Sequence, residues 1–273
     1  MKNNFQLIWI NGMPRSGTSW LGEIFNSHPD TKYRLAPLFS YEFKNFVNNN
    51  SSRKDWVDFF NKIYNYKSSN FLDQIELRKK KLFPTHVVKN ATPNYLILKH
   101  TRFHNLTENL IKNIPEIKLF HIIRNPCGVI NSWLLASKEF PENSNPLKEW
   151  ETGSCRKTGP EEFWGYNDWK AVTRLYLKLK SIYPENVFII RYEDLVNSPK
   201  KIIKSAFKFI NLPQHHQTDD FLIKSNNTHE DNDYSVYKSK KVKHKWKTQL
   251  NHEIKEAIFK DLDNSNLKIF LND

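Results

Sequence analysis

Short apolar runs, rich in β-branched and aromatic residues, alternate along this chain with longer stretches of helical spacing. The runs are Phe5–Ile10, His86–Val88, Ile117–Ile123 and Val187–Ile190, and most are short enough to be strands buried on both faces. The helical stretches are Thr18–Asn26, Trp56–Tyr64, Asn94–Ile111, Gly128–Ala136, Glu162–Ile182 and Pro199–Phe209. Strands that alternate with helices predict an α/β fold, a three-layer sandwich around a mainly parallel central sheet.

Local signals refine the second half of the chain. Ser198 before Pro199 is typical of a helix start, and Pro213 ends that helix. The polar stretch 214–237 predicts a loop. A final amphipathic helix is predicted from apolar residues spaced by four, namely Trp246, Leu250, Ile254, Ile258 and Leu262. Because no repeat and no Gly/Ser or Pro-rich linker interrupts the sequence, we expect residues 1–273 to form a single domain.

Composition narrows the class of protein. None of the 273 residues belongs to an apolar run near the roughly 18 residues that span a bilayer, and the start of the chain does not resemble a secretion signal. The two cysteines, Cys127 and Cys155, form neither a disulfide framework nor a zinc-binding spacing, so we expect a cytoplasmic setting. The net charge of +13 predicts an anionic partner: nucleic acid, a membrane, or a phosphorylated or sulfated small molecule.

The most informative segment is Ile8–Leu21, which predicts a strand, a glycine-containing turn and a helix. Gly12 and Gly17 let the backbone wrap closely around an anion, and the start of the following helix supplies N–H donors. Their spacing matches the nucleotide-hydrolase loop G-x-x-x-x-G-K-[ST], but Thr18 occupies the lysine position and the positive charge is on Arg15. The loop therefore lacks the lysine that, together with the following hydroxyl and magnesium, serves a β,γ-phosphate pair. Arginine, amides and hydroxyls suit a less charged group, such as a sulfuryl.

The segment from Gly12 to Leu21 resembles the 5′-phosphosulfate loop of the sulfotransferases that use 3′-phosphoadenosine 5′-phosphosulfate. Two downstream segments resemble further motifs of that family, in family order: Leu119–Pro126 with Ser132, and Val187–Leu195 with Pro199. The resemblance implies a P-loop-like sulfotransferase fold. It also implies this donor-binding set: Pro14, Arg15, Ser16, Gly17, Thr18, Ser19, Trp20, Arg124, Ser132, Tyr192, Lys240 and Lys241.

Roles within this set follow from chemistry and from the resemblance. Arg124 ends a predicted buried strand, at the sheet edge where open α/β folds bind ligands, and an arginine can hold a phosphate through two hydrogen bonds. Ser132, two turns along the next helix, can add a third. The resemblance gives Trp20 and Tyr192 contacts with adenine. It places a basic segment over the 3′-phosphate, which here is the lysine-rich run 238–247; a solvated face or recruitment of an anionic acceptor are alternatives for that run.

The acceptor side is less clearly marked. We expect Arg15 to stabilise the transferring group, with Lys89 as an electrostatic helper, because Lys89 ends a segment that resembles the family's lysine-bearing strand. The sequence departs from the family beside it: Val88 stands where many members have glutamate, and Ala91 where others have histidine. His86, on the same predicted strand face as Val88, is the nearest candidate base. Glu42, His100 and His104 are alternatives.

Together these features predict a sulfotransferase that moves a sulfuryl group from 3′-phosphoadenosine 5′-phosphosulfate to a hydroxyl, or less readily to an amine or guanidine, without a metal. The product is adenosine 3′,5′-bisphosphate. The acceptor is a saccharide or a small natural-product alcohol, with no nucleic acid or membrane as partner, and the oligomeric state is open. The alternatives are a nucleotide-dependent kinase with a variant loop and a basic nucleic-acid-binding protein, although the charge is concentrated near the C-terminus.

Overall fold

The computed structural model describes residues 5–228, 230, 232, 235–237 and 244–272. Five strands form one sheet in the order β2-β3-β1-β4-β5, and every neighbouring pair is parallel. The strands are β1 (Gln6–Gly12), β2 (Thr31–Leu35), β3 (Tyr95–Lys99), β4 (Lys118–Ile123) and β5 (Val187–Arg191). The predicted sheet class is therefore confirmed, and the carboxyl ends of all five strands meet at one edge.

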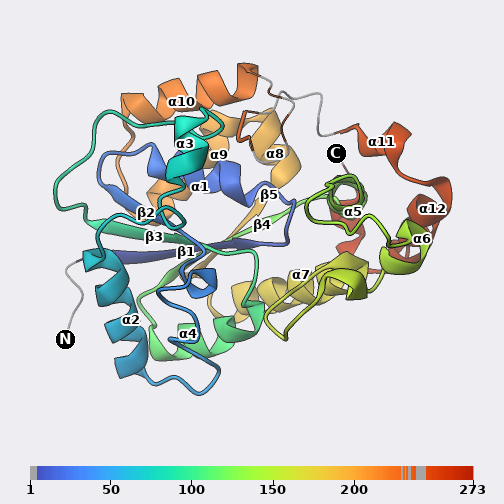
Figure 1. Cartoon of the computed structure of the whole chain (residues 1–273), viewed down its shortest axis with the longest axis horizontal. Helices are drawn as coiled ribbons and strands as arrows, with labels where there is room; N and C mark the ends of the chain where they lie inside the picture. The colour runs from blue at the N-terminus through green and yellow to red at the C-terminus, as the bar shows by residue number, and fades with distance from the viewer. Residues whose placement is uncertain (1–4, 229, 231, 233–234, 238–243, 273) are drawn as a thin grey trace.

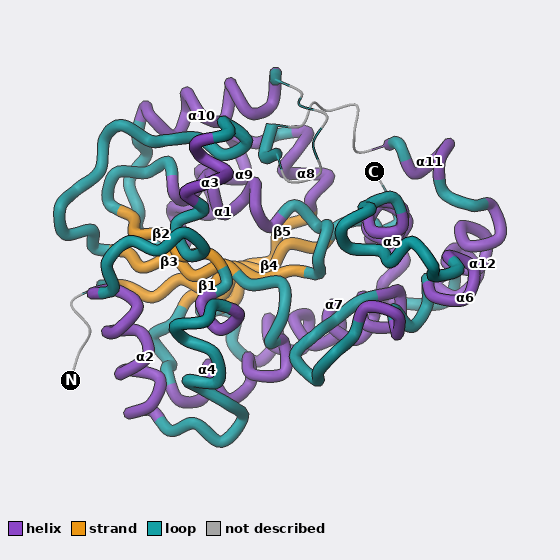
Figure 2. The backbone as a smooth tube through the Cα atoms, in the orientation of Figure 1, coloured by secondary structure: helices purple, strands orange, loops and turns teal. Residues whose placement is uncertain are grey.

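Helices cover both faces of this sheet (Figures 1 and 2). On one face lie α1 (Thr18–Asn26), α3 (Ile75–Lys79), α8 (Tyr192–Asn197), α9 (Pro199–Phe209) and α10 (His216–Asn227). On the other lie α2 (Arg53–Asn65), α4 (Thr107–Asn113) and α7 (Gly165–Ile182). Beyond the sheet are α5 (Pro126–Leu134), α6 (Pro146–Glu149), α11 (Trp246–Gln249) and α12 (His252–Leu262). In the described part of the chain, no helix has the length and apolar character that crossing a bilayer requires.

The alternation of side chains along β1 divides the core in two. Leu7 and Trp9 pack into the cluster that contains the apolar residues of α2, α4 and α7. Ile8 and Ile10 point to the opposite face and pack with those of α1, α9 and α10. A strand with both faces buried carries no polar alternation, and this is why the sequence of β1 reads as an uninterrupted apolar run.

Several predicted elements differ from the structure. The segment 86–88 is not a strand, and the stretch Asn94–Ile111 is β3 followed by a 3-10 turn and the start of α4, not one helix. β2 was not predicted, and α10 lies inside the expected loop 214–237. The predicted final helix is two helices, α11 and α12, separated at Leu250, although its five apolar positions are all buried as expected.

Candidate donor-binding site

The turn after β1 brings backbone amides to the carboxyl edge of the sheet, beside the N-terminus of α1. Gly17 precedes the first helical residue with φ +91°, and a Cβ at this position would lie 2.6 Å from the ring of Tyr192. A Cβ on Gly12 would lie 2.8 Å from both Ile122 and Thr18. Both glycines are therefore required by close packing, and Gly17 also by its left-handed backbone. The result is a tight loop whose amides and helix dipole favour an anion.

Three of the predicted donor-binding side chains meet at this loop. The Nε of Arg15 donates a hydrogen bond to the Oγ of Ser132 over 3.1 Å, and this contact joins the loop to α5. Arg124 follows β4, and its guanidinium donates to the backbone carbonyl of Arg15 over 2.9 Å. The structure thus places two guanidinium groups and a hydroxyl around one loop, although they come from segments more than 100 residues apart.

Buried polar atoms at this position fit an anionic ligand. The Oγ of Ser16 and the Nε of Arg124 are buried, and neither has a hydrogen-bond partner within the part of the chain that the structure describes. Pro14 and Thr18 are buried beside them, while Ser19 is half-buried at the first turn of α1. Because buried donors without partners are costly, a ligand oxygen that accepts from Ser16 and Arg124 would satisfy them.

Two aromatic side chains border the loop on the side of α10. Trp20 is half-buried; its indole N–H donates to Ser225 over 3.0 Å, and its ring lies edge-on to Tyr192 with 6.4 Å between centroids. Tyr192 is buried, and the Arg124 guanidinium lies 4.8 Å from its ring centre. Burial raises the pKa of Tyr192, so its phenol stays neutral. Lys240 and Lys241 lie outside the described residues.

The structure does not bring Lys89 to this loop. Its ammonium donates to the carbonyls of Asn26, His28 and Thr31 over 2.5, 3.0 and 2.9 Å. Thr31 is in register with Tyr95, which pairs with Gln6 at the start of β1, so these carbonyls lie at the amino edge of the sheet. The donor loop lies at the other edge. Lys89 therefore fastens its own segment to the end of α1.

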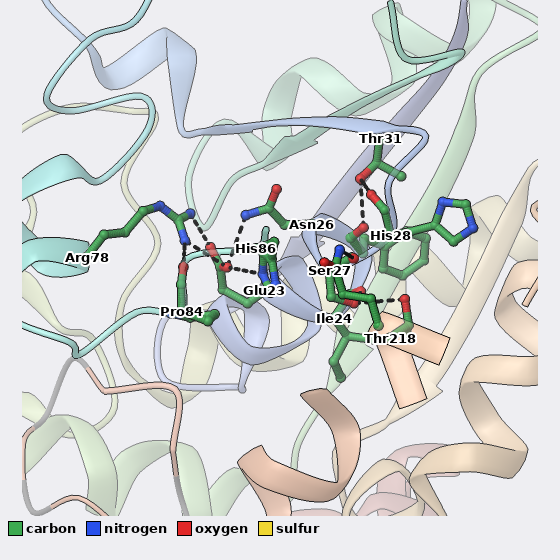
Figure 3. Close-up of polar contacts among 12 residues, drawn as sticks. Glu23, Ile24, Asn26, Ser27, His28, Thr31, Arg78, Pro84, His86 and Thr218 are labelled. Carbon is green, nitrogen blue, oxygen red and sulfur yellow. Dashed lines mark hydrogen bonds and ion pairs between the residues drawn. The ribbon is translucent and has the colours of Figure 1, made fainter. Parts of the chain in front are cut away.

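His86 is also held away from the loop, by a buried charge cluster on α1 (Figure 3). Its Nε2 lies 3.2 Å from the carboxylate of Glu23, which is fully buried and forms a 2.7 Å ion pair with Arg78. Burial alone would raise the pKa of Glu23, but the hydrogen bond from His86 and the Arg78 guanidinium outweigh it and lower the pKa. This geometry gives His86 a partner inside the fold, on the middle of α1.

The other candidate bases, His100, His104 and Glu42, are no better suited than His86 to accept a proton from an acceptor at the donor loop. His100 and His104 are fully buried, and burial lowers the pKa of His104 to about 3 and that of His100 well below its usual range. Glu42 is exposed in the segment after the Pro37–Phe39 turn.

Two charged residues that the sequence reasoning missed lie beside Arg15. Lys99 ends β3, next to β1 at the carboxyl edge, and is 7% exposed. Burial lowers its pKa to about 8, while Glu139 opposes this shift and Arg102 and Arg15 add to it. Glu139 lies 3.9 Å from the Arg15 guanidinium. The signal that could have found Lys99 is its place directly after the apolar run 95–98, which had been assigned to a helix.

Comparisons with known proteins agree with this geometry. Residues 6–268 match the family model of the sulfotransferase domain. A curated relative, cytosolic sulfotransferase 15 of Arabidopsis thaliana, is 29% identical over 216 residues, which cover 74% of this chain and 50% of the relative. The chain thus spans about half of the length of that relative.

Solved structures show the same fold. Mouse sulfotransferase SULT7A1, solved in complex with PAP, matches with a TM-score of 0.55 and 15% identity, covering 98% of this chain and 88% of its own. The sulfotransferase domain of the curacin biosynthetic pathway matches with a TM-score of 0.53 and 18% identity, over 95% and 98% of the two chains. With a family model that spans nearly its whole length, the chain belongs to the sulfotransferase domain family.

Proposed function

We propose that this protein transfers a sulfuryl group from 3′-phosphoadenosine 5′-phosphosulfate to an acceptor hydroxyl, or less readily to an amine or guanidine, without a metal. The observation that carries the proposal is the convergence of Arg15, Ser132 and Arg124 on one glycine-bounded loop. Because the chain belongs to a sulfotransferase family, two guanidinium groups and a hydroxyl around one loop suit a donor that carries anionic groups at both ends.

The two ends of the donor would take different residues. The loop amides and the hydroxyls of Ser16, Thr18 and Ser19 would bind the 5′-phosphosulfate, with Gly17 and Pro14 in the turn before α1. Arg124 and Ser132 bind the 3′-phosphate, with Lys240 and Lys241 as further candidates. Trp20 and Tyr192 border the adenine. The hydrogen bond between Arg15 and Ser132 links the two phosphate positions.

Transfer requires the acceptor oxygen to bond to sulfur while the bond from sulfur to the 5′-phosphate oxygen breaks, which releases adenosine 3′,5′-bisphosphate. Arg15 and Lys99 stabilise the negative charge that develops on the transferring and leaving oxygens. The acceptor proton goes to a base. The sequence points to His86, with Lys89 beside it, but these two side chains bind Glu23 and the carbonyl of Asn26 away from the loop. Glu139, in contrast, lies 3.9 Å from the Arg15 guanidinium. We propose Glu139 for this role, and a saccharide or natural-product alcohol as the acceptor.

One set of calorimetric titrations tests the donor assignment. We expect adenosine 3′,5′-bisphosphate to bind tightly without metal, and ATP with magnesium and a random oligonucleotide to bind weakly. Tight, magnesium-dependent binding of ATP with none of the bisphosphate would instead support the variant kinase. Preference for the oligonucleotide would support a nucleic-acid-binding protein.

A variant then tests the chemistry. Arg15→Ala should fold and should lower turnover on the order of 100-fold, since it removes a charge that meets the transferring group, a loss of about 3 kcal/mol. Arg53→Ala is the matched control, because its guanidinium pairs with Glu116 on an exposed surface. If Arg15→Ala kept more than about a tenth of the wild-type rate, the role given to Arg15 would be wrong.

A further inference from the structure

A second pair of arginines lies near Arg15 and is not among the residues assigned to the donor. Arg102 follows β3 three residues after Lys99, and Arg156 lies in a 3-10 turn before α7. Arg102 interacts electrostatically with Lys99, Glu139 and Arg156. The carboxyl edge beside Arg15 therefore carries more cations than the donor's own contacts use.

The surroundings of Arg102 resemble a binding site more than a simple surface ion pair. Its side chain is 14% exposed, and one terminal nitrogen lies 2.7 Å from the carboxylate of Glu162. The Nε is buried without a hydrogen-bond partner among the described residues. The guanidinium carbon lies 3.8 Å from the ring centre of Phe39, so the ring covers one face of the group. A guanidinium has five N–H donors, and these contacts leave part of the fork available.

Glu162 does not neutralise this region by itself. Its carboxylate already accepts hydrogen bonds from the backbone N–H and the hydroxyl of Thr158, over 2.6 and 2.8 Å, and it also interacts with Arg156. Arg156 in turn lies over the ring of Trp164, with its guanidinium carbon 5.5 Å from the ring centre. Around the site, the four cations Arg15, Lys99, Arg102 and Arg156 face the two carboxylates Glu139 and Glu162. Among these six described residues two positive charges are in excess, and an additional anion would reduce that excess.

Phe39 indicates where that anion's carbon skeleton would lie. It belongs to the 3-10 turn Pro37–Phe39 after β2, and it is 50% exposed although it packs against Arg102. The turn is fixed to the site because the N–H of Ala36 donates to the carbonyl of Lys99 over 2.7 Å. An exposed aromatic ring beside a partly unsatisfied arginine offers an apolar surface and an anion partner together.

We propose that Arg102 binds a carboxylate on the acceptor, while the acceptor's carbon skeleton packs on Phe39 and its hydroxyl reaches Lys99 and Glu139. The acceptor class is thus a hydroxy acid. The planar fork of arginine matches a carboxylate through two parallel hydrogen bonds. This inference rests on the proposed sulfotransferase function and deepens it, because it assigns a specificity residue that the donor does not use.

The test compares hydroxy acids with their methyl esters. The probes are straight-chain ω-hydroxy acids of graded length, offered to the wild-type enzyme with sulfur-labelled donor. The readout is the ratio of kcat/KM for each acid to that for its ester. We expect at least one acid to be preferred by tenfold or more. Arg102→Gln should bring the ratio close to one, and Arg102→Lys, which keeps the charge without the fork, should give an intermediate value.

Arg53→Gln is the matched control, because it makes the same substitution in an exposed guanidinium paired with Glu116. It should keep the wild-type ratio, which separates a local contact from the general charge of the protein. Thermal unfolding of each variant shows whether it is folded. Should Arg102→Gln fail to fold, the Arg102→Lys ratio decides.

Two outcomes overturn the inference. One is a wild-type ratio near or below one for every chain length. The other is a wild-type preference for acids that does not fall in folded Arg102→Gln, or in Arg102→Lys where Arg102→Gln does not fold. Where no acid is turned over, binding of the acids to the bisphosphate-loaded enzyme is measured, and no binding also overturns it. Failure of the proposed function has a different signature, since the bisphosphate itself would then not bind.

Discussion

Two lysines, one at each edge of the sheet, allow the active-site assignment to be tested directly. Lys89 resembles the family's catalytic lysine in sequence, but its ammonium donates to three backbone carbonyls at the amino edge. Lys99 is buried at the carboxyl edge, close enough to Arg15 to interact with it. Lys89→Met and Lys99→Met remove the same charge and should have opposite consequences.

Lys89→Met should reduce stability. The variant removes three hydrogen bonds to backbone carbonyls, at about 1 kcal/mol each, so the free energy of unfolding should fall by about 3 kcal/mol. For a domain of this size that corresponds to a decrease in Tm of roughly 6–12 °C. At a temperature where the variant is folded, kcat should stay within about twofold of the wild type, because the ammonium makes no contact with the donor loop.

Lys99→Met should reduce activity instead. It removes a buried charge beside the transferring group, and kcat should fall by about 10²–10³-fold. Its Tm should be unchanged or higher, since a buried amine is replaced by an apolar chain of similar length. The assays are calorimetric unfolding and initial rates with labelled donor. A Lys89→Met enzyme that keeps its Tm but loses 100-fold in kcat would refute the assignment from the structure.

Three further predictions use other contacts. Arg124→Ala should weaken adenosine 3′,5′-bisphosphate by roughly 1.5–3 kcal/mol but adenosine 5′-phosphate much less, as measured by calorimetry, and equal losses would contradict a specific 3′-phosphate contact. Because Lys99, with a pKa of about 8, is cationic only below that pH, kcat/KM should decline as pH rises through about 8, and Lys99→Arg should remove this alkaline limb. Glu23→Gln should lower the free energy of unfolding by about 3 kcal/mol, since it breaks a buried ion pair. The control Glu116→Gln breaks an exposed ion pair and should change this free energy by less than about 1 kcal/mol. Equal losses in denaturant titrations would contradict this difference.

Elements with strong local signals could be predicted closely from the sequence. α1 has the bounds expected from its glycine start and apolar stripe, and α9 begins at Pro199 and ends at Phe209, as its cap and the later proline indicate. β2 gave no such signal, because Lys32 and Arg34 interrupt its apolar residues. Arg34 is nevertheless buried, where Asp73 and the carbonyl of Tyr66 bind its guanidinium. A partner about 30 to 40 residues away cannot be inferred from the strand itself.

The strand β3 was not predicted from the sequence, for a different reason. The apolar residues 95–98 run directly into His100, Phe103, Leu106 and Leu110, whose spacing is helical, so strand and helix merged into one predicted element. The same error hides Lys99 inside a predicted helix, whereas Lys89 is expected on the acceptor side because its own segment resembles the family's lysine-bearing strand. Periodicity indicates which face of a helix or strand a residue occupies. It does not indicate at which edge of the sheet the segment ends, and that edge determines which lysine lies beside the donor loop.

The positions of the candidate donor residues that the structure describes could, in contrast, be predicted, because most of them belong to a contiguous motif at the end of a strand. The motifs do not indicate how closely their side chains pack against one another. Tyr192 lies against Gly17 closely enough to exclude a Cβ, and Arg124 lies over Tyr192 while it holds the carbonyl of Arg15. The residues assigned to adenine, 3′-phosphate and phosphosulfate thus form one packed unit. A change in any of them should therefore alter the others, because close-packed interiors transmit displacements.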